Sequence, residues 1–437
     1  MFQQLVNGNS DPISGTNTST IQKSKFGYGI PTVVPSDLLF TESKLGVPVT
    51  RGPIKRRAQQ TEYNSLGNNE IIFQFPNDSL YDARRGYLTF DLAINTVGGT
   101  YKRIAEGIWS VFYRIRTKLG FELENMFEYN RYYSIIWDAL NDARQSSAVA
   151  RKLMGIGTPT ERNILGASTS HYVMPLLSGF FDQDMLPLNL INNIAELFLN
   201  LGDAATYVET DGASPTITIT NLRFHMEKIS AANEYLQRVR AAMGSSGLTL
   251  GYNTVNYYSQ NLNAGASSIQ SIIINHKSAS LKGFISVFTQ SNQVANPLIN
   301  DKFRTWLKFT DRHQLRLNER LFPEEPVEYG DVLSAEAYMT YLNWAKKWNL
   351  SGNLRFEPPP ITVEEFSADK FLLIVDVNGY PYDDDVINPV GNDNVSIQMQ
   401  LDINIPLPLP ANFRFDTFVS YFRQIKINAN GTVDVTF

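Results

Sequence analysis

Hydrophobic and polar residues alternate along much of the chain after residue 68, which is the pattern of half-buried β-strands. In residues 85–94, Leu88, Phe90 and Leu92 share one face of the predicted strand. Residues 109–119 alternate in the same way, and their apolar face begins with Trp109. Further strands are predicted in the first half of the chain at residues 70–75, 171–177 and 216–229.

The second half of the chain shows the same alternation. Strands are predicted there at residues 250–258, 269–276, 281–289, 314–321, 371–377, 395–405 and 418–427. The dipeptide Asn430-Gly431 separates two alternating runs near the end of the chain, which predicts a β-hairpin. A Gly/Ser cluster at residues 244–247 separates the two halves and predicts a domain boundary.

One amphipathic helix is predicted midway through each half. In residues 124–141 and again in residues 332–348, apolar and aromatic side chains recur every three or four positions. The two helices align loosely, with Tyr129 where Tyr338 falls. We expect each helix to pack its aromatic face against the flank of its own domain, which predicts that Trp137 and Tyr338 are buried.

Each half therefore contains strands, one helix and further strands. This order predicts an all-β protein with two tandem antiparallel sandwiches, at residues 67–244 and 245–437, of the jelly-roll or the immunoglobulin class. Residues 1–66 show no sustained periodicity, and four prolines interrupt them. We expect these residues to form an extended N-terminal arm that contributes no sandwich strand.

The charge distribution makes this arm basic. Residues 1–60 carry seven basic and three acidic side chains, a net charge of +4, so residues 61–437 sum to −9 within a total of −5. Lys55, Arg56 and Arg57 form the densest basic cluster of the arm. Such a cluster is either a solvated loop or a contact for a polyanion or an acidic partner.

Composition limits the chemistry that the protein can carry. Charged residues make up 19% of the chain and aromatic residues 12%, which fits either a large β-rich core or extensive protein interfaces. The absence of cysteine excludes disulfides, thiolate catalysis and cysteine-ligated zinc. No run approaches the roughly 20 apolar residues of a membrane span. The first residues also lack the pattern of a secretory signal.

No catalytic, cofactor or metal site is predicted. The sequence contains none of the common nucleotide-binding or hydrolase motifs. The four histidines are far apart in sequence and are expected to be ordinary sheet residues (His171, His225, His276 and His313). The acidic segment that begins at Asp376 resembles a calcium loop, but the positions that should hold Gly and Glu hold Pro381 and Ile387.

The segment from Trp109 to Leu140 resembles the double jelly-roll major capsid proteins of polinton-like viruses and virophages. In that family an alternating strand, a short turn and an acidic residue precede a helix that begins with Tyr-Asn, matched here by Glu122, Glu124, Tyr129 and Asn130. Residues 185–188 (Met-Leu-Pro-Leu) and the C-terminal strand pair with its Asn-Gly turn are further matches. The resemblance implies two tandem eight-stranded antiparallel jelly rolls, each with a flanking helix.

The resemblance also implies a function. It predicts the major capsid protein of a double-stranded DNA virus, a homotrimer that forms a pseudo-hexagonal capsomer and tiles an icosahedral shell. Its expected partners are neighbouring capsomers, penton and minor capsid proteins, with no small-molecule substrate and no cofactor. The protein would be part of the virion and would assemble inside the host cell. Lys55, Arg56 and Arg57 would face components in the particle interior.

Two other functions remain open from the sequence. One is a shell or spike protein with a single jelly roll and an appended domain. The other is a two-domain β-sandwich protein that binds carbohydrate, or a glycoside hydrolase, which needs two carboxylates roughly 5–10 Å apart in a cleft. Exposed tryptophans in a cleft would favour the carbohydrate hypothesis, yet four of the five fall on predicted strands or helices (Trp109, Trp137, Trp344 and Trp348).

Overall fold

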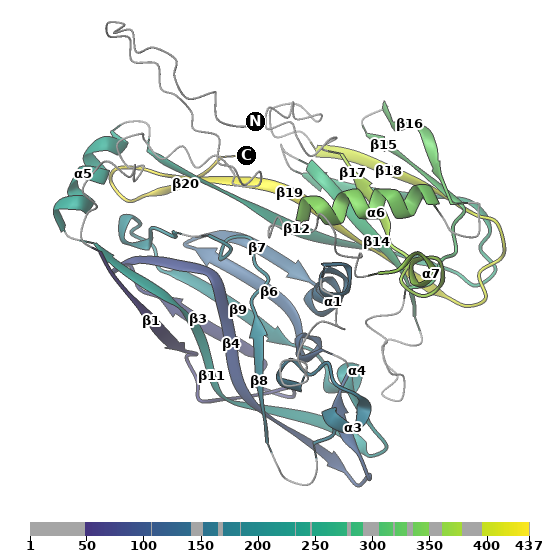
Figure 1. The fold of residues 1–437 in the computed structure, drawn as a ribbon, viewed down its shortest axis with the longest axis horizontal. Coiled ribbons are helices and arrows are strands. Elements are labelled where there is room, and N and C mark those ends of the chain that lie inside the picture. Colours follow the sequence, from purple (N-terminus) through teal and green to yellow (C-terminus); the bar gives the residue numbers. More distant parts are fainter. Residues whose placement is uncertain are drawn as a thin grey trace, which may run out of the picture.

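Figure 1 shows a computed structural model in which two β-sandwiches follow one another along the chain. The first is drawn in purple to teal, and the second runs from teal through green to yellow. The structure describes residues 49–105, 107–140, 152–164, 169–183, 185–231, 233–244, 247–277, 281–291, 306–317, 320–329, 335–348, 361–377 and 396–436.

The first sandwich consists of two facing antiparallel sheets. One has the strand order β1-β11-β4-β8, with the short β2 beside β11, and the other has the order β3-β9-β6-β7. A separate pair, β5 and β10, completes this half. The strands are β1 (Val49–Arg57), β2 (Glu62–Asn64), β3 (Glu70–Phe75), β4 (Leu80–Val97), β5 (Lys102–Ile104), β6 (Phe112–Leu119), β7 (Glu122–Phe127), β8 (Ser170–Pro175), β9 (Ala195–Leu201), β10 (Val208–Thr210) and β11 (Ala213–Ala231).

Alternation along these strands fills the space between the sheets. The predicted inward face of β4 (Leu88, Phe90 and Leu92) is fully buried. From the other sheet, the ring of Phe75 packs 5.5 Å from the ring of Phe224 on β11. Burial of each such side chain stabilises the fold by about 1.5–3 kcal/mol, and a slip of one residue in register would lose the whole set.

The second sandwich repeats this plan. Its sheets have the orders β12-β19-β14-β17, with β20 beside β19, and β13-β18-β15-β16. Four strands lie on the main path of each sheet in both sandwiches, which confirms the predicted pair of eight-stranded antiparallel sandwiches. The strands are β12 (Leu248–Leu262), β13 (Ser268–Lys277), β14 (Leu281–Gln290), β15 (Arg312–Leu317), β16 (Arg320–Glu328), β17 (Leu373–Asp376), β18 (Ser396–Ile405), β19 (Phe413–Ile427) and β20 (Val433–Thr436).

The predicted C-terminal hairpin is present. β19 and β20 pair from Ile427 opposite Val433, and Gly431 in the connecting turn has a φ of +82°, which favours glycine. The turn also contacts the first sandwich, because the side-chain amide of Asn192 donates to the carbonyl of Asn430 over 2.9 Å. The hairpin therefore helps to join the two halves of the chain.

The helices are short. They are η1 (Ile108–Val111), α1 (Tyr129–Leu140), α3 (Pro159–Arg162), η2 (Leu188–Leu190), α4 (Ala204–Tyr207), α5 (Asn233–Met243), α6 (Ala335–Trp348) and α7 (Val363–Ala368). Within the described ranges, no helix is long and apolar enough to cross a membrane.

Two predicted elements differ from the observed ones. The strand expected from Trp109 begins at Phe112, after the 3-10 turn η1, and an irregularity in its pairing with β9 beside Tyr113 turns that ring toward solvent. The helix expected from Glu124 begins at Tyr129, because residues 122–127 form strand β7. Apolar spacing alone could not separate the end of this strand from the start of the helix.

The expected arm is wrong for its last residues. Strand β1 pairs with β11 along its whole length, from Val49 opposite Ala231 to Arg57 opposite Arg223, and β2 pairs with the same strand. β1 is the last strand of its sheet, a position in which Pro53 breaks no essential hydrogen bond. The described part of the first sandwich therefore begins at residue 49, and the rest of the expected arm lies outside the described residues.

Candidate functional site

The junction between the two sandwiches holds most of the buried charge that the structure describes, and α1 lies in it (Figure 1). The ring of Tyr132 on α1 packs 5.3 Å from the ring of Phe418 on β19. The hydroxyl of Tyr341 on α6 donates to the carbonyl of Ala139 over 3.0 Å. The two helices thus contact each other, and α1 also packs on the second sandwich, which the prediction that each helix flanks its own domain did not include.

The opposite side of α1 packs into the first sandwich. The indole of Trp109 stacks on Tyr133 with ring centroids 4.6 Å apart, and its Nε1 donates to the hydroxyl of Ser134 over 2.7 Å. Trp137 packs 5.3 Å from the same indole but is only half-buried, as is Tyr338 on α6. Trp109, rather than Trp137, is therefore the anchor of this helix.

Four charged side chains form a closed cluster at the junction. Arg131 on α1 contacts Glu128 over 2.9 Å and Asp416 on β19 over 3.1 Å. Arg414 contacts the same two carboxylates, Glu128 over 3.2 Å and Asp416 over 2.7 Å. The side chains are 3%, 9%, 22% and 0% exposed for Arg131, Glu128, Arg414 and Asp416 respectively. Two cations and two anions from both sandwiches thus neutralise one another.

Local groups complete this ion cluster. The hydroxyls of Tyr257 and Thr289 donate to Asp416 over 2.6 and 3.0 Å. Burial lowers the pKa of Arg414, but the charges of Asp416 and Glu128 outweigh it and raise that pKa above its usual value. Glu128 reaches its place through a left-handed backbone with a φ of +53°, which costs about 1–2 kcal/mol in a non-glycine residue. The two ion pairs that it makes offset this strain.

Glu124 is a second buried acid of the junction. Its carboxylate accepts hydrogen bonds from the hydroxyls of Ser178 and Thr117, over 2.5 and 2.8 Å. The backbone amides of Gly179 and Phe180 also donate to it, over 2.8 and 3.2 Å. Burial raises the pKa of Glu124, and these four donors act against the rise. The carboxylate holds the loop of residues 178–180 against the end of β7.

That loop meets the second sandwich at a position where only glycine fits. A Cβ built on Gly179 would lie 1.5 Å from the carbonyl oxygen of Asn253 on β12. Close by, the side chains of Tyr252 and Arg423 both donate to the carbonyl of Leu123 on β7, over 3.3 and 2.6 Å. Backbone and side chains thus fix the position of one sandwich on the other.

The geometry of the junction indicates a structural role. Its carboxylates are already bound by arginines, hydroxyls or backbone amides. No group of three or more potential metal ligands occurs among the described residues. The arrangement can therefore orient two domains.

Comparison with known proteins gives structural matches only. No family model matches the sequence, and no curated protein matches it. The structure is similar to VP54 of PBCV-1, fitted into a reconstruction of the virophage Sputnik, with 11% identity, a TM-score of 0.59 and coverage of 91% of this chain and 99% of that chain. The Faustovirus major capsid protein matches with 8% identity, a TM-score of 0.59 and coverage of 89% and 92%. The structure of the Sputnik virophage matches with 11% identity, a TM-score of 0.54 and coverage of 100% and 95%.

The fold is a double jelly roll. These matches span both sandwiches, so the likeness concerns the tandem arrangement as well as each domain. The expected boundary at residues 244 and 245 falls between α5, at the end of the first jelly roll, and β12, at the start of the second.

The basic cluster expected on an arm lies on the first jelly roll instead. Lys55, Arg56 and Arg57 are consecutive residues of β1, so their side chains alternate between the faces of the sheet. Lys55 and Arg57 are exposed, whereas Arg56 turns inward and donates to the hydroxyl of Tyr81 over 3.2 Å. That these residues face a particle interior stays a prediction.

The histidines all lie on strands. His276 on β13 and His313 on β15 are buried in the second jelly roll, and burial lowers their pKa values to about 4 and about 3. His225 on β11 stacks on Tyr87 with centroids 4.5 Å apart, and the exposed His171 on β8 pairs with Asp91 over 2.8 Å. Most of the acidic segment that resembles a calcium loop, from residue 378 onward, lies outside the described residues.

Sequence reasoning missed the ion cluster of the junction. Opposite charges two positions apart in an alternating strand, such as Arg414 and Asp416 on the same face as Phe418, are the signal that could have revealed it. The partners of Asp416 lie 285 positions away, at Arg131, and two positions away, at Arg414. Sequence spacing could not pair them.

Proposed function

We propose that this chain is the major capsid protein of a double-stranded DNA virus and has a structural rather than an enzymatic role. The observation that carries the proposal is the match of both jelly rolls, in tandem and over nine-tenths of the chain, to capsid proteins of such particles. The buried contacts of the junction support it, because a building block must present its two domains in one fixed orientation to make the same contacts many times.

The proposed assembly follows from the tandem fold. Three copies around a threefold axis present six similar domains, which gives a pseudo-hexagonal capsomer suited to an icosahedral shell. The partners are then neighbouring capsomers, penton proteins and minor capsid proteins, and the place of the protein is the virion, after assembly inside the host cell.

The carbohydrate hypothesis gains no support from the described tryptophans. Trp109, Trp306 and Trp344 are buried, and Trp137 is half-buried against Trp109. None of these four offers the exposed indole face on which a sugar ring stacks.

The mass of the purified full-length chain tests the proposal. Sedimentation velocity at micromolar concentration and neutral pH should give a species of three times the 49.3 kDa of one chain. Electron microscopy of this species should show a block with six-fold pseudo-symmetry. A chain that stays at 49.3 kDa would contradict the proposal. Binding or cleavage of the oligosaccharides on a glycan array would also contradict it.

A further inference from the structure

The two jelly rolls end in edge strands of opposite charge. β1 is the last strand of its sheet in the first jelly roll, and among the described strands it pairs with β11 alone. Within the described ranges, β16 is the last strand of its sheet in the second jelly roll and pairs only with β15. The two strands lie on opposite sides of the molecule in Figure 1.

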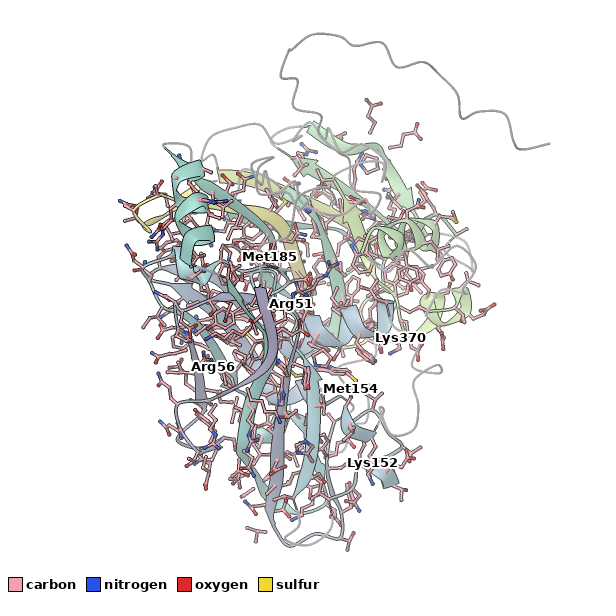
Figure 2. All side chains as sticks on the ribbon, turned by 60° about the vertical axis from the view of Figure 1, so that its left-hand side comes forward. Arg51, Arg56, Lys152, Met154, Met185 and Lys370 are labelled. Carbon is pink, nitrogen blue, oxygen red and sulfur yellow. The ribbon has the colours of Figure 1, made fainter. Side chains whose placement is uncertain are left out.

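The β1 edge is basic. Arg51, Lys55 and Arg57 are exposed on it, and Figure 2 marks Arg51 and Arg56 along this strand. In the pairing with β11, Lys55 lies opposite His225 and Arg57 lies opposite Arg223. Arg57 and Arg223 are two cations that lie directly opposite one another, which destabilises a sheet, so the fold gains nothing from this pair. In the described part of the chain, neither Lys55 nor Arg57 has an ion-pair partner, although Arg51 lies 3.9 Å from Glu227.

The β16 edge is acidic, and it is shaped to project. Residues 323–326 (Pro-Glu-Glu-Pro) stand opposite the single residue Gln314 of β15, so they form an irregular bulge of four residues against one. The side-chain amide of Gln314 donates to the carbonyls of Pro323 and Glu324 over 3.3 and 2.9 Å, which holds the bulge in place. Glu324 and Glu325 on the bulge are exposed.

Charges and prolines on edge strands also protect proteins against unwanted strand addition. That explanation accounts for charge on each edge but not for opposite signs on the two edges. Opposite signs make identical edges repel and unlike edges attract, which disfavours a two-fold contact of like edges and favours a head-to-tail contact. The prolines remove backbone donors, so such a contact would use side chains rather than a continuous sheet.

We propose that the β1 edge of one copy binds the β16 bulge of a second copy, with Lys55 and Arg57 facing Glu324 and Glu325. The inference rests on the self-association proposed above and names its surfaces. Head-to-tail contacts of this kind close into a ring when the rotation between copies allows it. It also assigns the basic cluster to an acidic protein partner rather than to a polyanion in the particle interior.

Charge reversal in the full-length chain tests these surfaces. The variants Lys55→Glu/Arg57→Glu and Glu324→Lys/Glu325→Lys should each weaken trimer formation by about tenfold or more in sedimentation velocity. The variant that combines all four substitutions should recover the wild-type trimer. Wild-type association should also weaken between about 0.05 and about 0.5 M NaCl, as screening shortens the range of the attraction.

Mixing the two reversed variants separates a three-membered ring from a two-fold dimer. In a two-fold pair, each reversed edge would meet its complement, and mixing would restore association. In a ring of three, at least one contact must join two copies of the same variant, so mixing should not restore the trimer. A mixture that forms stable two-chain particles would overturn the head-to-tail ring.

The control is Lys152→Glu, which reverses an exposed charge of the first jelly roll that Figure 2 marks away from Arg51 and Arg56 of β1, and it should leave the trimer intact. If a reversed variant fails to fold, as judged by its thermal melt, Lys55→Gln/Arg57→Gln takes its place. Charge-reversed variants that form trimers like wild type would overturn the proposed surfaces. A variant with all four substitutions that does not recover the trimer would also overturn them, and in both cases the capsid proposal stands. A wild-type chain that stays monomeric at every concentration would instead refute the capsid proposal.

Discussion

Acid should destabilise this protein well above the pH at which carboxylates titrate, because two histidines are buried in the second jelly roll. His276 and His313 are 0% and 1% exposed, and burial lowers their pKa values to about 4 and about 3. In the unfolded chain both rings should titrate near 6.5. These two rings therefore bind protons in the unfolded state as the pH falls through 6.5, whereas in the folded state they bind them only near pH 4 and pH 3.

The size of the effect follows from these pKa values. The contribution of the two neutral histidines to the free energy of unfolding is fully present above pH 6.5. It is lost as the pH falls toward their pKa values in the folded protein. At pH 5, which is roughly 1.5 pH units below the pKa of about 6.5, protonation of each ring stabilises the unfolded chain by about 2 kcal/mol. The two histidines together therefore lower the free energy of unfolding by about 4 kcal/mol. This is a large fraction of the 5–15 kcal/mol that typical proteins have.

Denaturant unfolding followed by tryptophan fluorescence measures this loss at about pH 7 and about pH 5. The matched variant is His276→Phe/His313→Phe, which keeps an aromatic ring at each site and removes both titrations. Wild type should lose about 4 kcal/mol more than the variant between the two pH values. Glu124, whose pKa is raised by burial, has the opposite effect on stability, because its protonation in acid favours the folded state. This effect is the same in wild type and variant, so it cancels in their difference. Equal losses in both would refute the histidine argument.

Three further substitutions probe the junction, each measured as a change in the free energy of unfolding. Gly179→Ala should destabilise the protein by more than about 3 kcal/mol, since its Cβ would overlap the Asn253 carbonyl. The control Gly52→Ala should change the stability little, because nothing lies within 4 Å of a Cβ at that position. Similar losses in the two variants would refute the close approach at Gly179. Asp416→Asn should cost about 3–5 kcal/mol by leaving the buried Arg131 and the partly buried Arg414 short of an anion, and a cost under about 1 kcal/mol would contradict the burial of this cluster. Trp109→Ala should cost about 3–5 kcal/mol, and substitution of the half-buried Trp137 by Ala should cost less. The reverse order would show that Trp137, not Trp109, anchors α1.

The sequence predicted the architecture because that information is local. Alternation in residues 85–94 and the Asn430-Gly431 turn depend on neighbouring positions only, and both predictions are confirmed. The boundary between β7 and α1 could not be predicted as well, since Glu124 and Met126 fit a helical stripe and a strand equally. The left-handed backbone at Glu128, which ends one element and begins the other, has no signature in a single sequence.

The error at the N-terminus has a similar physical origin. Residues 49–57 contain Gly52, Pro53 and three consecutive basic residues, which disfavour a central strand. An edge strand tolerates all of them, because only one side of its backbone needs partners. Whether a segment lies at an edge is decided by the rest of the sheet, so a local pattern could not place β1.

The buried ion cluster is better explained by specificity than by stability. An apolar junction of the same volume could hold two jelly rolls together as tightly, because the desolvation of Arg131 and Asp416 offsets most of their attraction. An apolar surface, however, tolerates sliding and rotation, whereas four alternating charges are satisfied in one arrangement only. The strained Glu128 and the close approach at Gly179 point the same way, since each restricts the orientation of the domains more than it strengthens their contact. A protein whose basic and acidic edges lie on different domains needs this restriction, because the head-to-tail contact repeats correctly only if every copy holds its two edges at the same angle.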